Sequence, residues 1–61
     1  MAQINELELQ NLRHMIGAHE TCIKKLETYA QQCQDPTLKQ MFQADANDAK
    51  ANKQKLMSFL Q

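Results

Sequence analysis

Residues 35–42 read Asp-Pro-Thr-Leu-Lys-Gln-Met-Phe, and this stretch decides the fold. Proline disfavours a helical conformation at the residue before it, so a helix that arrives from the N-terminal side has to end here. Proline also suits the first position of a new helix, and the Asp35 side chain can cap that helix. The stretch therefore predicts a corner at residues 35–36 between two helices.

An apolar stripe precedes the corner. Its members recur at alternating spacings of three and four residues, as in a helix that packs nearly parallel to another helix. They are Leu9, Leu12, Ile16, His19, Ile23, Leu26, Ala30 and Cys33. Asn5 and Glu8 stand three residues apart, as in a capping box, and predict where the helix starts. We expect a first helix over about residues 5–34.

A second stripe follows the corner at the same spacings. It consists of Leu38, Phe42, Asp45, Ala49, Asn52, Leu56 and Phe59. It predicts a second helix over about residues 36–60 that runs back antiparallel along the first. His19 and Asn52 lie at similar distances from the corner, so we expect them to meet in a hydrogen-bonded polar layer.

The composition also favours helix throughout. The 61 residues include one glycine, one proline and no valine, whereas Ala, Leu, Lys, Gln and Glu are abundant. We expect an all-α fold in which residues 1–61 form a single helical hairpin. Cys22 and Cys33 are eleven positions apart, which is about 16 Å along one helix and too far for a disulfide between them.

A lone hairpin would be marginally stable, because two helices cover only one side of each other and a chain this short buries little surface. The apolar stripe of the first helix is wider than one partner helix can cover. We therefore expect two hairpins to form a homodimeric four-helix bundle, with a tetramer as the alternative. The residues predicted to form the dimer core are Met15, Ile16, His19, Cys22, Ile23, Leu26, Tyr29, Met41 and Phe42.

The charge balance argues against some partners. Seven basic residues offset seven acidic ones, so we expect neither nucleic acid nor an anionic membrane surface to be bound. The longest apolar run, residues 15–18, is far shorter than a membrane span, and residues 1–11 lack the features of a signal peptide. A cytoplasmic location is the expectation.

We expect no catalytic residues and no cofactor, because the sequence contains no recognisable nucleophile with a base and no paired carboxylates in a predicted cleft. The leading hypothesis is a non-enzymatic structural or interaction protein. One alternative is a metal- or redox-responsive dimer, because His19 and Cys22 share a helix face and a two-fold axis would bring two of each together. Another alternative is an adaptor that binds a helix of a different protein.

The stretch at residues 35–42, preceded by a stripe that contains His19 and Glu20, resembles the coat F family of spore coat proteins over about residues 7–60. The resemblance implies a ferritin-type helical hairpin, a structural role in sporulation, incorporation into the spore coat and other coat or helical proteins as partners. The chain departs from the Glu-x-x-His pairs of ferritin-like metal enzymes. Ile16 stands where a glutamate would precede His19, and the pair Asp45 and Asp48 has no histidine.

Overall fold

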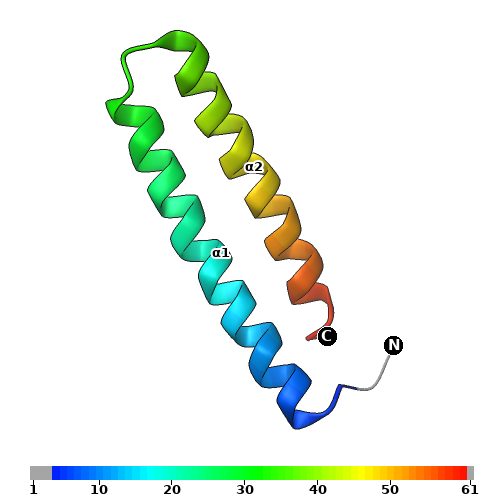
Figure 1. The fold of residues 1–61 in the computed structure, drawn as a ribbon. Helices are drawn as coiled ribbons and strands as arrows, with labels where there is room; N and C mark the ends of the chain where they lie inside the picture. Colours follow the sequence, from blue (N-terminus) through cyan, green and yellow to red (C-terminus); the bar gives the residue numbers. More distant parts are fainter. Residues whose placement is uncertain (1–3, 61) are drawn as a thin grey trace.

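The computed structural model describes residues 4–60 and consists of two antiparallel helices (Figure 1). Helix α1 spans Glu6–Gln32 and helix α2 spans Pro36–Ser58. Residues 33–35 join them, and no strand occurs within the described part of the chain. The predicted all-α hairpin is therefore confirmed.

A complete capping box starts α1, as the sequence predicts. The backbone N–H of Glu8 donates to Oδ1 of Asn5 at 2.8 Å, and the backbone N–H of Asn5 donates to Oε1 of Glu8 at 3.2 Å. Both bonds satisfy N–H groups that have no partner within a helix. Ile4 and Leu9, which flank this box, are half-buried.

The Asp35 carboxylate caps α2. Its Oδ1 accepts from the backbone N–H of Thr37 at 2.8 Å and from that of Leu38 at 3.0 Å. Pro36, which has no N–H to satisfy, is the first helical residue. The corner therefore lies where the sequence predicts it.

The first helix ends at Gln32, two residues earlier than expected. The reason is geometric, because packed helix axes lie about 8–10 Å apart and an extended residue spans about 3.3 Å. About three extended residues are needed to cross that distance. Cys33 and Asp35 indeed have extended backbones.

The second helix ends at Ser58 rather than at about residue 60. The backbone N–H of Phe59 donates to the carbonyl of Leu56 at 3.2 Å, and that of Leu60 donates to the carbonyl of Met57 at 3.0 Å. These bonds span three residues instead of four and tighten the chain into a final turn.

The seam of α1, meaning the residues that face α2, follows the predicted stripe. All seven stripe residues within the helix are buried or half-buried, and every other residue of α1 is exposed. Cys33, the last member of the stripe, is half-buried in the corner. A spacing of threes and fours was therefore sufficient to orient this helix.

At two positions of α2, the residue that lies at the seam is the one directly after the residue that was predicted. Asp45 and Asn52 are exposed, whereas the neighbouring residues Ala46 and Lys53 lie between the helices. Burying Asp45 would remove a carboxylate from water without a partner, while Ala46 lets the helices approach closely. Lys53 can occupy a seam position because its alkyl stem covers apolar surface while its ammonium group reaches solvent.

Two further residues of the predicted stripe, Leu38 and Phe59, are exposed as well, at 42% and 51%. Leu38 lies in the first turn of α2, and Phe59 is the residue directly after its last turn. The half-buried or buried residues of α2 are Phe42, Ala46, Ala49, Lys53 and Leu56.

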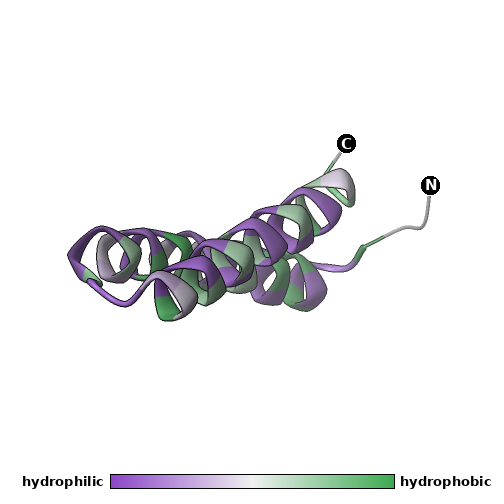
Figure 2. Ribbon diagram, turned by 90° about the horizontal axis from the view of Figure 1, so that it is seen from above, coloured by the Kyte–Doolittle hydropathy of each residue, from purple (hydrophilic) through white to green (hydrophobic). Residues whose placement is uncertain are grey.

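The core between the helices is thin. Its buried side chains are Leu12, Ile23, Ala30 and Ala46, and no large side chain within residues 4–60 is fully buried. Hydrophobic and hydrophilic segments alternate along both helices, as Figure 2 shows. Each helix therefore has one apolar side, and the stability of the helix depends on packing that covers this side.

The hairpin is elongated, with extents of 46 × 17 × 12 Å and a radius of gyration of 14.3 Å. A compact domain of the same length would have a radius of gyration of about 10.5 Å. The fold is thus a rod one helix layer thick.

Gly17 lies on the outer surface of α1, where a methyl group at Cα would meet no atom within 4 Å. We expect Gly17→Ala to raise the free energy of unfolding by about 0.5–1 kcal/mol, because alanine loses less backbone entropy in a helix. Chemical denaturation of both proteins at one protein concentration measures the difference. A loss of stability would mean that Gly17 makes a close contact in the folded protein.

Candidate functional site

One side of the hairpin, called here the ion-pair face, is closed by salt bridges between the helices. Nζ of Lys50 lies 2.9 Å from Oε2 of Glu27, and Nζ of Lys53 lies 3.2 Å from Oε1 of Glu20. Glu20 and Glu27 are seven residues apart and so occupy one strip of α1. This face is suited to contact with water, because its charged groups already pair with each other across the two helices.

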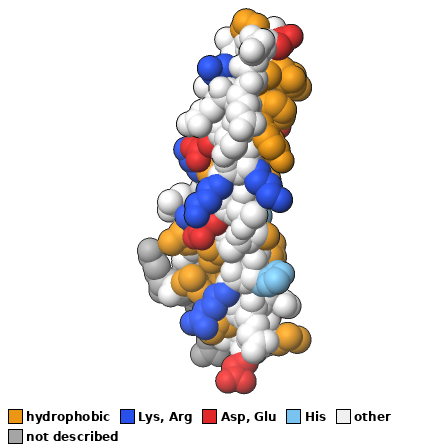
Figure 3. Space-filling model, turned by 90° about the vertical axis from the view of Figure 1, so that its left-hand side faces the viewer, with side chains coloured by type: hydrophobic (Ala, Val, Ile, Leu, Met, Phe, Trp, Pro, Cys, Tyr) orange, Lys and Arg blue, Asp and Glu red, His pale blue; other side chains and the backbone are white. Residues whose placement is uncertain are grey.

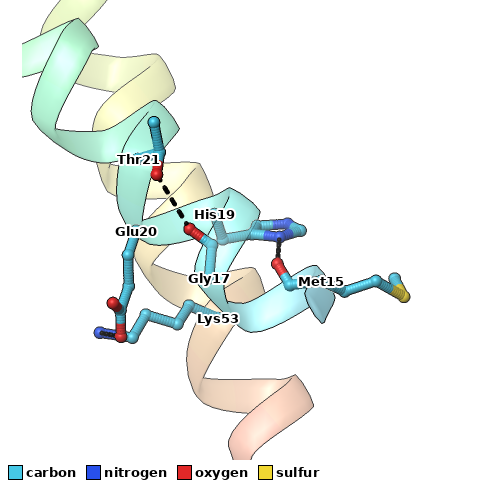
Figure 4. Close-up of polar contacts among 6 residues, drawn as sticks. All are labelled: Met15, Gly17, His19, Glu20, Thr21 and Lys53. Carbon is cyan, nitrogen blue, oxygen red and sulfur yellow. Dashed lines mark hydrogen bonds and ion pairs between the residues drawn. The ribbon is translucent and has the colours of Figure 1, made fainter. Parts of the chain in front are cut away.

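The opposite side, called here the open face, is apolar where the ion-pair face is charged. Met15, Cys22 and Tyr29 are also seven residues apart, on the other flank of the α1 seam, and all three are exposed. In Figure 4 the side chains of Met15 and His19 point to one side of α1, whereas Glu20 and Lys53 pair on the other. The two faces therefore differ in chemistry along the same stretch of helix.

The space-filling view in Figure 3 shows the same division on the outside of α1. In the half near the corner, hydrophobic side chains gather along one edge, which also carries an acidic side chain at the corner and a basic one near mid-height, and further acidic and basic side chains lie on the opposite edge. Large apolar side chains on this scale commonly mark an interaction surface.

A shallow groove, called here the central groove, crosses the middle of the open face. It is lined by Ala18, His19, Cys22, Leu26, Asp45, Asp48, Ala49 and Asn52. The lining includes two carboxylates, one imidazole, one thiol and one amide, but no lysine or arginine. Polar groups are thus concentrated at one level of an otherwise apolar face.

His19 has a fixed orientation within this groove. Its Nδ1–H donates to the carbonyl oxygen of Met15, 2.9 Å away (Figure 4). The predicted hydrogen bond between His19 and Asn52 does not occur, although both residues line the central groove. Because a carbonyl only accepts, Nδ1 carries a proton and Nε2 is the nitrogen that remains free to take one up.

Apolar surface lies on both sides of the central groove. Toward the corner, the rings of Tyr29 and Phe42 stack in a tilted arrangement with centroids 5.8 Å apart, and Met41 is 58% exposed. Met41 is four residues before Asp45, so it shares the same side of α2. Aromatic pairs of this geometry are stabilising and are common in interfaces.

A second groove lies toward the open end of the hairpin. It is lined mainly by apolar side chains from both helices and by one carboxylate. The lining residues are Ile4, Glu8, Asn11, Leu12, Met15, Leu56 and Phe59. The open face is therefore apolar at both ends and polar in the middle.

The residues predicted to form the dimer core are not all placed alike. Four of them, Met15, Cys22, Tyr29 and Met41, are exposed, and four are half-buried at the seam: Ile16, His19, Leu26 and Phe42. Ile23 is buried between α1 and α2 and borders the ion-pair face. Ile23 therefore contributes to the core of the hairpin itself.

The alternative site predicted from His19 and Cys22 has both residues in the central groove, where Asp45 and Asp48 also lie. Within residues 4–60, no group of three or more His, Cys, Asp or Glu side chains is arranged to hold a metal ion. Both cysteines are free thiols, with Cys22 exposed and Cys33 half-buried.

Sequence reasoning did not predict that Asp45 and Asp48 line a groove together, because it placed Asp45 on the seam of the second helix. Ala46 could have indicated the correct rotation of the second helix, because a small apolar residue is easier to bury at a close helix contact than the aspartate beside it. Lys53 was missed for a different reason. A charged residue is normally assigned to the surface, although the alkyl part of a lysine side chain can pack at a helix contact.

No helix within residues 4–60 combines the length and the apolar character that crossing a bilayer requires. Comparison with protein-family models, with curated proteins and with solved structures finds no match to this chain.

The ion pairs should contribute modestly to stability because their charged groups are about half exposed, apart from Lys53. We expect Lys50→Glu, which places two carboxylates opposite each other, to lower the free energy of unfolding by about 1 kcal/mol or less. Adding Glu27→Lys should restore most of the loss. Urea denaturation of the parent, the single variant and the double variant tests this, and the differences should shrink in 1 M salt.

Equal stability of the parent and Lys50→Glu would mean that the pair between Glu27 and Lys50 contributes nothing in solution. In that case the ion-pair face would be merely polar.

Proposed function

We propose that this chain is a non-enzymatic self-associating module in which two hairpins pack through their open faces into a four-helix bundle. The observation that carries the proposal is the difference between the two faces. One face is closed by ion pairs, and the other exposes Met15, Tyr29 and Met41 at 48%, 48% and 58%. Large exposed apolar side chains on a face where the described helices form no ion pair with each other favour a partner on that face.

The exposed area of the chain supports the same proposal. The accessible surface is 4978 Å², whereas a folded monomer of 7.1 kDa would have about 4,100 Å². The excess of about 900 Å² is close to the area of about 800 Å² that each partner buries in an interface of standard size. Burying about 800 Å² of the open face would bring the exposed area of each chain close to that of an ordinary folded monomer of the same mass.

A second copy of the chain is the occupant that fits best. An apolar face on an elongated rod is self-complementary when two copies are related by a two-fold axis, and such dimers are the commonest closed assemblies. The product would be a four-helix bundle, in which each helix contacts two others and the open flank of the α1 seam is covered.

The shape of the grooves favours a structural role over a catalytic one. Two helices form open grooves on their surface, whereas substrate sites are usually concave and bury most of their ligand. A substrate in the central groove of a single hairpin would remain largely in water. For this reason we assign His19 and Cys22 to the interface and not to an active site.

Two methionines give a matched test of the interface. Met15 lies on the open face, and Met57 is two helical turns after Lys50 on the ion-pair face. We expect Met15→Glu to weaken self-association by at least about tenfold, because it buries a charge in the interface, whereas Met57→Glu should leave it nearly unchanged. Sedimentation equilibrium at micromolar concentrations measures the dissociation constants.

The parent protein should sediment as a dimer or a larger assembly, and its melting temperature should rise with protein concentration. A compact monomer whose melting is independent of concentration would refute self-association. Equal effects of the two glutamate variants would instead place the interface away from the open face.

A further inference from the structure

The central groove lies at the midpoint of the open face. His19 is the middle residue of α1, and Asp45 and Asp48 flank the middle of α2. Apolar residues lie on both sides of this level, with Tyr29 and Phe42 toward the corner. The open face therefore has an apolar, polar, apolar order along its length.

This order fixes how two copies align, if they associate as proposed above. In a parallel dimer, each residue of one open face lies opposite the same residue of the second copy. In an antiparallel dimer, the middle of one open face lies opposite the middle of the other when the apolar ends cover apolar ends. Either arrangement brings the two central grooves together, because a shifted copy would bury polar groups against apolar ones.

The meeting of two central grooves creates an electrostatic problem. Four carboxylates would face one another, two each from Asp45 and Asp48, together with two His19 rings and two Cys22 thiols. The nearest lysines on the same helical strips are Lys25, seven residues after Ala18 on α1, and Lys55, seven residues after Asp48 on α2. Neither lysine lines the groove. Removing unpaired carboxylates from water is costly.

We propose that self-association of this chain is linked to proton uptake by His19. The Nδ1–H bond to Met15 leaves Nε2 free, so each ring can accept one proton from solvent there without changing its orientation. The imidazolium that forms offsets the carboxylates of Asp45 and Asp48 in the joined grooves. A histidine is the one side chain whose ordinary titration falls between pH 5 and 8.

The direction of the effect follows from linkage. The associated form binds more protons than the free hairpins, so association strengthens as the pH falls and weakens as it rises. Up to two protons are taken up per dimer, one by each His19. Measurements between pH 6 and pH 8 lie within the range in which a histidine ordinarily changes charge.

The test compares dissociation constants at pH 8 and pH 6 at constant ionic strength, by sedimentation equilibrium. We expect the parent to associate about tenfold more tightly, or better, at pH 6. His19→Gln should remove this pH dependence. His14→Gln is the matched control, because His14 is the other histidine and lies on the outer surface of α1. This variant should keep the pH dependence of association.

A second variant tests the carboxylates independently. The double substitution Asp45→Asn and Asp48→Asn should tighten association at pH 8 and reduce the difference between the two pH values. This variant keeps His19, so the inference remains testable if His19→Gln does not fold.

The outcomes separate the two proposals. Association that is equally strong at both pH values, or a pH dependence that persists in His19→Gln, would overturn the proton linkage and leave self-association standing. A chain that stays monomeric at both pH values would refute self-association and the proton linkage with it.

Discussion

Two packed helices cover only one side of each other, and the rest of this structure depends on that constraint. The seam is filled by small and medium side chains, of which Ala30 and Ala46 are the most buried at 3% exposure each. A contact of this kind brings the helices close but removes little apolar surface from water. Apolar side chains on the open flank of the seam, such as Met15 and Tyr29, stay exposed in the hairpin.

The chain treats its two flanks differently, and the difference explains why the hairpin has a single candidate surface. On one flank, Glu20 and Glu27 of α1 pair with lysines of α2, so charged side chains are satisfied within the chain. On the other flank, Met15, Cys22 and Tyr29 take part in no ion pair. Cys22 lines a groove with Asp45 and Asp48, and Tyr29 packs against Phe42. If the chain self-associates as proposed, a second layer of helices would therefore pack on one face only, which would limit growth into larger stacks.

The sequence predicted the fold well because the decisive signals are local. Capping by Asn5 and Asp35, and the break at Pro36, require only the residues around them, and all three have the expected roles. The rotation of α2 was harder to predict, because a stripe through Asp45 fits a spacing of threes and fours as well as a stripe through Ala46 does. Choosing between them requires the free energy of burying a carboxylate against α1, which is a property of both helices together. The resemblance to the coat F family stays a prediction, as does the role in sporulation that it implies.

If the chain self-associates as proposed, the polar level in the middle of the apolar face would weaken association but would determine how the two chains align. If the open face were apolar from end to end, a second hairpin could slide by one heptad, about 10.5 Å, and still bury most of the same surface. With His19, Asp45 and Asp48 at the midpoint, that slide would place carboxylates against apolar side chains such as Tyr29 and Met15. Polar residues at single positions of helical bundles set register in this way, at some loss of stability. The same groups that make the groove a poor contact at neutral pH would thus select one alignment of the two chains, so alignment and proton dependence would share one physical origin.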